Sequence, residues 1–286
     1  MTPTPEILHK KMRPVLRFHG GKWRISDWII SFFPPHTIYV EPFGGAASVL
    51  MRKTRSTIEI YNDIDTQIVN VFRILRHPRK SKKLFKLLEL TPYSRQEFND
   101  AYSPSSDPIE QARRTIIISY HSYGTRAATS THRTAFRMAK QSQRNYALDW
   151  LRYPSSVFYF CRRLKSVIIE NSDYKQIILK NDSPATLFYL DPPYPHSTRC
   201  ISHCDAYRHE FSTDQHIELA AILHNIKGMA VLSTYESPLY HQLYPDWKMV
   251  QRRAYVQSAQ GRGSRTSVES LLLSPNIISN QLSLLQ

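Results

Sequence analysis

Two short apolar runs separated by a glycine turn constrain the fold of this chain more than any other feature. Thr37–Glu41 and Thr57–Tyr61 are rich in β-branched and aromatic residues, which favours strands. A turn at Gly44-Gly45 follows the first run, and Ala46–Lys53 has the composition of a helix. Two strands joined by a helical crossover lie parallel in one sheet, so the sequence predicts an α/β fold.

The same pattern returns late in the chain. Ala185–Leu190 is an apolar run of the kind found in buried strands, and it stops at Asp191. A helix is predicted from Thr213 to about Ile226, with Leu219, Ile222, Leu223 and Ile226 on one face. Strands are predicted at Met229–Ser233 and Ser267–Leu273. These elements continue the α/β fold.

The middle of the chain has a different pattern. Residues 93–161 show no strand alternation, and their ends have helical patterns. From Arg126 to Lys165, nine Lys or Arg stand against one acidic residue, Asp149. We therefore predict an inserted, mainly helical subdomain at 93–161, within a domain formed by residues 1–92 and 162–286. Its basic composition alone is also compatible with a plain solvated surface.

The net charge of the chain limits the classes of partner that it can be expected to bind. Lys+Arg 38 against Asp+Glu 23 gives +15, an excess that favours nucleic acid first and an anionic membrane surface second. No run of 18 apolar residues is present, so we expect no membrane span. Three cysteines, an odd number in a long chain, favour a reducing compartment over a disulfide framework. We expect a cytoplasmic protein that is a monomer and needs no protein partner.

The segment Asp191-Pro192-Pro193-Tyr194 is the sharpest functional motif. Ligands of open α/β sheets bind beyond the carboxyl ends of strands, where this segment is predicted to lie. The two prolines stiffen the backbone and lack an N–H, so acceptors outnumber donors. The Asp191 carboxylate and the Pro192 carbonyl suit a group with two N–H donors, such as the exocyclic amine of a base. Tyr194 adds a face for stacking. A strand-ending turn without a catalytic role has the same composition.

Two further motifs point to a nucleoside ligand. The segment Glu41–Gly45 ends the first strand, and its glycines let the backbone approach a ligand. Asp63 ends the second strand, where Rossmann-type units hold ribose hydroxyls. No P-loop lysine follows. Phe18–Lys22, upstream, is either a glycine loop that folds over the ligand, with Lys22 reaching a carboxylate, or a plain N-terminal loop.

These motifs occur in the order GGK, EPFGG, NDID, basic insertion, NSDY, DPPY and LS. In that order they resemble the D12 class, or Dam-like family, of DNA adenine-N6 methyltransferases. The resemblance covers nearly the whole chain, and Phe188–Pro195 with Ser197-Thr-Arg199 is most similar to prophage-type members. It implies a Rossmann-like methyltransferase sheet with helices on both faces. It also makes residues 93–161 the subdomain that recognises the DNA target.

The resemblance implies S-adenosyl-L-methionine (SAM) as the cofactor. The residues that would bind it are Phe18, Lys22, Glu41, Phe43, Gly44, Gly45, Asp63, Asp173, Tyr174 and Asp191. Among them, Asp63 would bind the ribose hydroxyls, and Asp173 and Tyr174 match the segment that contacts the adenine of SAM. Phe18 stands where many family members carry Trp, and Ala47 stands where the turn usually has its second glycine.

The expected reaction is methyl transfer to the exocyclic N6 of an adenine flipped out of duplex DNA. The resemblance makes Asp191, Pro192 and Tyr194 the catalytic residues, with no metal. The candidate DNA-binding residues of the insertion are Arg126, Arg133 and Arg137. Two alternatives remain: a nucleic-acid-binding protein on the same fold that has lost methylation, and a methyltransferase directed at RNA.

Two other clusters have less specific signals. Cys200 and Cys204, with His196, His203 and His209 nearby, form a C-x₃-C pattern without a second pair, which is a poor zinc template.

The basic run Arg76–Lys86 is either the solvated side of a helix, with Leu84, Leu87 and Leu88 facing inward, or a secondary DNA contact.

Overall fold

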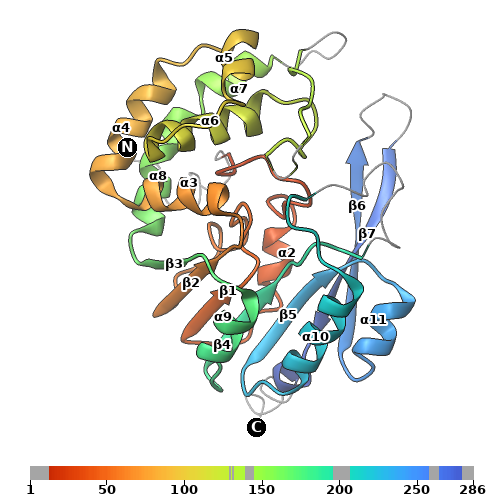
Figure 1. Ribbon diagram of the computed structural model, residues 1–286. Coiled ribbons are helices and arrows are strands. Elements are labelled where there is room, and N and C mark those ends of the chain that lie inside the picture. The colour runs from red at the N-terminus through yellow and green to blue at the C-terminus, as the bar shows by residue number, and fades with distance from the viewer. Residues whose placement is uncertain are drawn as a thin grey trace, which may run out of the picture. The chain divides into compact units, whose positions relative to one another are not determined.

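The computed structural model describes residues 13–128, 130, 132–138, 145–195, 207–257 and 264–278 of the 286-residue chain. The chain divides into two compact units (Figure 1). Unit 1 consists of Met1–Asp27, Gly45–Thr54 and Asp65–Ile169, and unit 2 of Trp28–Gly44, Arg55–Ile64 and Glu170–Gln286. The insertion expected at 93–161 falls wholly within unit 1.

Most strands of the mixed sheet lie in unit 2, and residues 167–169 of one strand belong to unit 1. The strands are β1 (Ile38–Glu41), β2 (Ile58–Asn62), β3 (Val167–Glu170), β4 (Thr186–Leu190), β5 (Met229–Thr234), β6 (Lys248–Gln257) and β7 (Ser264–Leu273). Their order is β3-β2-β1-β4-β5-β7-β6. β1 pairs in parallel with β2 and β4, and β4 pairs in parallel with β5. β7 is antiparallel to both of its neighbours. The predicted α/β fold is confirmed.

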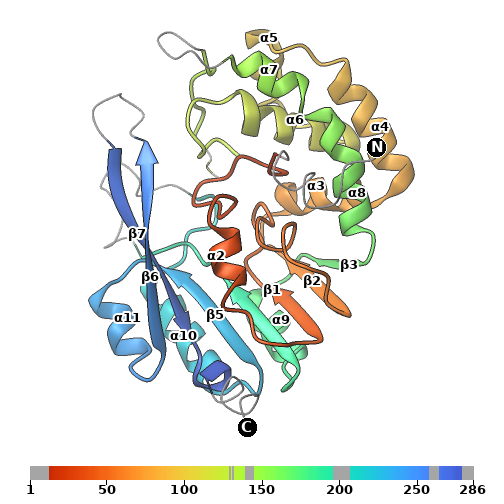
Figure 2. The same ribbon diagram turned by 180° about the vertical axis from the view of Figure 1, so that it is seen from behind.

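The central strands have the composition of strands covered on both faces. β4 and β5 are buried along their whole length, and their sequences, TLFYL and MAVLST, are almost continuously apolar. Three helices, α9 (Tyr174–Lys180), α10 (Thr213–His224) and α11 (Pro238–Leu243), lie over one face of the sheet (Figures 1 and 2). α10 begins with a capping box, in which Ser212 and Gln215 each accept from the other's backbone N–H.

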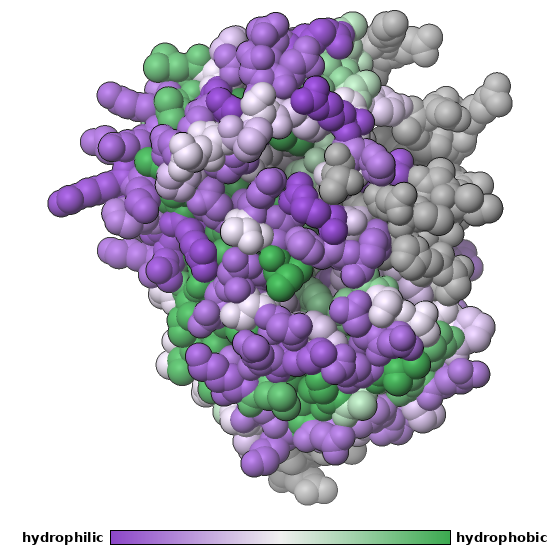
Figure 3. All heavy atoms as spheres, in the orientation of Figure 1, coloured by the Kyte–Doolittle hydropathy of each residue, from purple (hydrophilic) through white to green (hydrophobic). Residues whose placement is uncertain are grey.

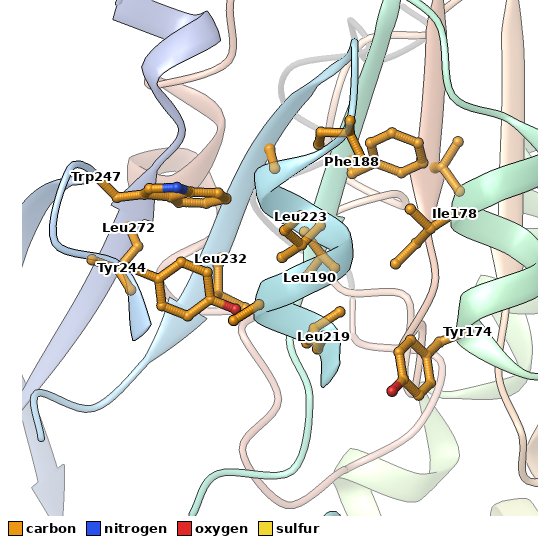
Figure 4. Close-up of a cluster of buried hydrophobic side chains, with 14 of the residues drawn as sticks. Tyr174, Ile178, Phe188, Leu190, Leu219, Leu223, Leu232, Tyr244, Trp247 and Leu272 are labelled. Carbon is orange, nitrogen blue, oxygen red and sulfur yellow. The ribbon is translucent and has the colours of Figure 1, made fainter. Parts of the chain in front are cut away.

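A cluster of buried hydrophobic side chains lies between this face of the sheet and the helices (Figure 4). Leu219 and Leu223 of α10 point down onto the sheet, because residues four apart share a helix face. Phe188 and Leu190 of β4 meet them, being two apart and therefore on the same face of the strand. Each such buried side chain contributes about 1.5–3 kcal/mol, so this layer holds the sheet on which the site is built.

Unit 1 is mainly helical. Its helices are α3 (Thr66–Arg76), α4 (Pro78–Glu89), α5 (Arg95–Asp100), α6 (Pro108–His121), α7 (Tyr146–Leu151), the 3₁₀ turn η1 (Pro154–Ser156) and α8 (Val157–Leu164). α3 packs against α4, α6 and α8. Its N-terminus is capped by Asp65, which accepts from the backbone N–H groups of Gln67 and Ile68. The short helix α2 (Ser26–Ile30) spans the boundary between the units.

The structure corrects several expectations about local structure. Ala46–Lys53 is a series of turns and not a helix, although Met51 N still bonds to Ala47 O at 2.9 Å. The strand β6 at Lys248–Gln257 was not expected, and β7 begins earlier than predicted, at Ser264. Leu87 is 38% exposed, whereas Leu84 and Leu88 are buried as expected.

No helix in the described ranges is both long enough and apolar enough to cross a bilayer.

Candidate active site

Three carboxylates follow three neighbouring strands of unit 2. Asp63 comes directly after β2, Glu41 is the last residue of β1, and Asp191 comes directly after β4. Because β2, β1 and β4 are adjacent and parallel, their carboxyl ends meet at one edge of the sheet. The strand order reverses between β1 and β4, which is where open α/β sheets form their ligand crevice. Glu41 and Asp191 stand on either side of that point.

Asn62, the last residue of β2, ties the loops at this edge together. Its Nδ2 donates to Pro42 O and to Ser172 O, both at 2.9 Å, and its Oδ1 accepts from Ser172 N at 2.9 Å. Its backbone carbonyl accepts from Gly44 N at 2.7 Å. The side chain is 1% exposed. One buried amide thus fixes the segments that follow β1, β2 and β3. The sequence motif that contains both residues predicted a role for Asp63 and none for Asn62, so the role of Asn62 was missed.

Glu41 is held from within its own strand. Tyr39 lies two residues earlier on the same face, and its hydroxyl donates to Glu41 Oε1 at 2.6 Å. Burial, followed by the charge of Glu41, raises the pKa of Tyr39 well above its ordinary value. The Tyr39 hydroxyl therefore keeps its proton and orients the carboxylate, which is itself 2% exposed.

Gly44 allows two strand ends to approach each other. A Cβ atom at this position would lie 2.2 Å from the ring of Tyr61 and 2.9 Å from Asn62 O. Any side chain would therefore push the loop after β1 away from β2. The glycine predicted to lie near a ligand is thus required by the packing of the protein itself.

Phe43 and Tyr174 lie together, as part of an aromatic group. Their rings stack at 5.1 Å with an angle of 29°, and Phe211 packs edge-on against both. The Tyr174 hydroxyl donates to Glu218 at 3.4 Å, and burial raises the pKa of Tyr174. Asp173 caps α9 by accepting from the backbone N–H of Lys175 at 2.8 Å. Both residues of the expected adenine segment therefore also organise the start of α9.

The segment after β4 is anchored through Tyr194. Its hydroxyl lies 3.1 Å from Ser233 Oγ and donates to Glu269 Oε2 at 3.4 Å. Its ring meets the ring of Tyr235 edge-on at 4.6 Å and is 8% exposed. Burial, then the charges of Asp191 and Glu269, raises the pKa of Tyr194 well above its ordinary value. In this arrangement the phenol stays protonated and its ring is largely covered.

The glycine loop belongs to unit 1, as does Gly45. Gly21 N bonds to Phe18 O at 3.2 Å, which closes a turn. Gly45 has φ 47°, and a Cβ atom there would lie 2.9 Å from Phe18 Cε1, so the Phe18 ring packs directly over this glycine. Lys22 is 4% exposed, and its Nζ donates to Gly20 O at 2.6 Å.

Ala47 has a left-handed backbone, with φ 51°, although it is not a glycine. This geometry costs an alanine about 1–2 kcal/mol, which explains both the missing helix after Gly45 and the usual preference for glycine here. We expect Ala47→Gly to change the free energy of unfolding in urea by less than about 1 kcal/mol, because relief of the left-handed backbone offsets both the larger entropy of glycine in the unfolded chain and the loss of a buried methyl group. The matched control, Ala46→Gly, changes a buried neighbour without positive φ and should destabilise. Equal effects would remove backbone strain as the cause.

The three candidate DNA-binding arginines lie in unit 1. Arg133 stacks over the ring of Tyr102 at 4.8 Å, and Arg137 over the ring of Tyr146 at 3.7 Å. Arg126 is partly buried. The backbone N–H of Arg137 donates to His121 O at 2.7 Å, which ties this segment to the end of α6. The rings hold the Arg133 and Arg137 side chains in place.

Among the described residues, no three His, Cys, Asp or Glu side chains are grouped as metal ligands. Cys200 and Cys204, with His196 and His203, lie outside the described residues, whereas His209 is exposed.

The fold is an α/β sheet with carboxylates at the carboxyl ends of β2, β1 and β4, the edge at which open α/β sheets bind their ligands. Residues 18–257 match the family described as D12 class N6 adenine-specific DNA methyltransferase. The chain belongs to this family. It is a SAM-dependent methyltransferase that modifies adenine in DNA at N6.

Similar proteins cover nearly the whole chain. It is 22% identical to the DNA adenine methylase of Escherichia coli K12 in an alignment of 285 positions that covers 94% of this chain and 98% of that protein. It is 23% identical to the DNA adenine methylase of Salmonella typhimurium, with 92% and 95% covered. It is 21% identical to the type II methyltransferase M.MjaIII of Methanocaldococcus jannaschii, with 92% and 99% covered.

Proposed function

We propose that the protein methylates N6 of an adenine flipped out of duplex DNA, with Asp191, Pro192 and Tyr194 as catalytic residues. The observation that carries the proposal is the position of Asp191, directly after β4 and beside the point where the strand order reverses. The sheet is then a Rossmann-like methyltransferase sheet with helices on both faces. A closer relation to prophage-type members rests on Phe188–Pro195 alone.

The residues at the edge of the sheet fit SAM. Its ribose hydroxyls and its ammonium group are donors, and this edge of unit 2 offers carboxylates. We assign Asp63 to the ribose, Glu41, Phe43 and Gly44 to the methionine part, and Asp173 and Tyr174 to the adenine. Gly45, Phe18 and Lys22 of unit 1 complete the predicted set. When bound, SAM supplies an electrophilic methyl group, which adenine N6 accepts by direct displacement with release of S-adenosylhomocysteine and one proton.

The acceptors after β4 prepare the target amine. The lone pair of N6 is delocalised into the adenine ring, which makes the amine a poor nucleophile. Asp191 Oδ and Pro192 O, as two acceptors for its two N–H groups, favour a pyramidal nitrogen with a localised lone pair. Because both acceptors are fixed on a stiff segment, they need no reorganisation during the reaction.

The target base must leave the duplex at a cost of a few kcal/mol. Stacking on Tyr194 recovers about 1–3 kcal/mol of this, once the ring becomes accessible. The charge of unit 1 contributes phosphate contacts, and we assign these to Arg126, Arg133 and Arg137 within residues 93–161 as the target-recognition subdomain. The protein acts on double-stranded DNA as a monomer inside the cell.

The test is transfer of tritium from labelled SAM to unmethylated duplex DNA, followed by analysis of the nucleosides. We expect N6-methyladenine. Transfer to structured RNA and not to DNA would make the protein an RNA methyltransferase. DNA binding without transfer to any duplex, from a pool of random sequences, would favour a binding protein that has lost methylation.

We expect Asp63→Ala to weaken SAM binding about ten- to a hundredfold in calorimetric titration, because a hydrogen bond to a charged group contributes roughly 1.5–3 kcal/mol. Asp65→Ala is the matched control. Asp65 caps α3, so its loss should lower stability by about 1 kcal/mol and leave the affinity for SAM intact. Undiminished affinity in Asp63→Ala would place the ribose elsewhere.

A further inference from the structure

The helix α4 presents a row of cations that the fold does not use. Arg79, Lys80, Lys82, Lys83 and Lys86 are all exposed, while the inward face is formed by Ser81, Leu84 and Leu88. Within the described residues, none of the five cationic side chains has an ion pair or a hydrogen bond. In Figure 3 hydrophilic side chains project over the position of α4, at the upper left.

This arrangement opposes the stability of the helix. The first turn of α4 holds Arg79 and Lys80 and no acidic residue, although the positive end of the helix dipole disfavours cations there. Pairs such as Lys82 and Lys86 place like charges one turn apart, where they repel. The like charges therefore cost α4 a few tenths of a kcal/mol per pair in stability.

Two cations of α6 in the same unit, Arg113 and Arg114, are neutralised by acidic residues. Arg113 of α6 binds Glu97 at 2.8 Å and Glu110 at 2.7 Å, and Arg114 binds Glu110 at 2.7 Å. Glu110 lies in the first turn of α6, where the dipole favours an acid. The charges of α4 are therefore distinct from the internal pairing that holds α5 and α6 together.

The surface beside α4 extends the row. α8 packs against α4, and the rings of Phe85 and Phe158 meet at 4.7 Å. Phe158 is 54% exposed, and Lys165 at the end of α8 is exposed as well. Leu84 and Leu88 of α4 are buried, and the exposed apolar side chains on this surface are Leu87, Leu90 and Phe158, which are too few to form the continuous apolar face that inserts into lipid. An unneutralised basic surface of this kind fits the phosphates of a nucleic acid.

We propose that α4 and the end of α8 form a second DNA-contact surface, separate from the arginines of the 122–138 segment. It binds the phosphates of duplex outside the methylation site, without reading sequence, and so holds the enzyme on long DNA. The inference rests on the proposed function in that it takes duplex DNA as the partner.

The test compares two duplexes with the triple variant Lys82→Ala, Lys83→Ala, Lys86→Ala. One duplex is short, about one and a half helical turns, and the other is long, about six turns. On the long duplex, the dependence of log K on log salt should lose about 0.9 unit of slope for each phosphate contact removed. On the short duplex, both the slope and methyl transfer should stay as in the wild type. Alanine favours helices, so the variant is expected to fold.

Two further variants make the outcome decisive. The first is a triple variant of unit 2, Lys180→Ala, Lys227→Ala, Lys248→Ala, which removes the same charge from exposed sites. On long DNA, the salt dependence of its binding should stay steeper than that of the α4 variant. Arg133→Ala, Arg137→Ala should weaken binding to both duplexes. An unchanged slope for the α4 variant on long DNA would overturn the second surface. The same conclusion would follow if the α4 variant lost binding to anionic lipid vesicles and kept the binding of the wild type to long DNA. A wild type that binds neither duplex would instead overturn the proposed function.

Discussion

Replacing Asp191 by alanine should lower the rate of methyl transfer by about a thousandfold and leave DNA binding unchanged. The expected loss is large because Asp191 is the charged one of two fixed acceptors for the target amine, and removing one preorganised group of this kind costs roughly 10²–10³ in rate. Single-turnover transfer of tritium measures the rate, and fluorescence anisotropy with a labelled duplex measures binding. Asp191→Asn keeps an acceptor oxygen and loses the charge, so its rate of transfer should lie between the rates of the wild type and of Asp191→Ala.

The matched control for this prediction is Asp246→Ala. Asp246 is an exposed carboxylate of the same unit, 3.8 Å from His224, and its removal changes the net charge equally. Its rate should equal that of the wild type. Turnover close to normal in Asp191→Ala would remove the assignment of this residue to catalysis, whatever the control shows.

The second large effect concerns acid stability and His121. This residue ends α6, is fully buried, and packs against the rings of Tyr93 at 4.4 Å and Trp150 at 4.5 Å. Neither ring nitrogen has a hydrogen-bond partner among the described residues. Burial, followed by the charge of Arg113, lowers the pKa of His121 to about 3. The imidazole is therefore neutral in the folded protein, in surroundings that penalise a proton.

The sign of the effect follows from linkage. The unfolded chain takes up a proton at His121 as the pH falls through about 6.5, whereas the folded chain resists until about pH 3. Stability is therefore full above pH 6.5 and is lost as the pH falls toward 3. Between pH 7 and pH 5 the wild type should lose about 2 kcal/mol more than His121→Phe, and by pH 3 roughly 4 kcal/mol.

Urea unfolding at a series of pH values measures this difference. The slope against pH is the readout, because a change in packing shifts the stability of His121→Phe equally at every pH. His209→Phe, which changes an exposed histidine, should keep the pH slope of the wild type. Parallel curves for the wild type and His121→Phe would show that the buried imidazole does not resist protonation.

Much of the fold could be predicted because the central strands carry strong local signals. β4 and β5 are almost continuously apolar, as is typical of strands buried on both faces, and β1 and β2 end at a glycine turn and an acidic residue. β6 could not be predicted, because Lys248–Gln257 mixes charged, polar and apolar residues and becomes a strand only by pairing with β7. Ala46–Lys53 has helical composition, but the left-handed backbone of Ala47 interrupts it.

In the candidate site too, the residues with a local sequence signal were predicted and those without one were missed. Asp63, Glu41 and Asp191 were identified because each follows a recognisable strand. Ser233 and Glu269, which hold the Tyr194 hydroxyl, were missed as partners, because they lie 39 and 75 residues away in the sequence. Their roles depend on strand pairing between β5 and β7, which no local pattern specifies.

The buried amide of Asn62 has a consequence for how the edge of the sheet opens. Because this one side chain is bonded to the loops after β1 and β3, detachment of either loop leaves a polar group of buried Asn62 unpaired and so weakens the hold on the other loop. The backbone amides of Gly44 and Ser172 should therefore exchange with deuterium at the same rate, as one cooperative opening unit. Loops that are distant in sequence would then share a single local free energy of opening.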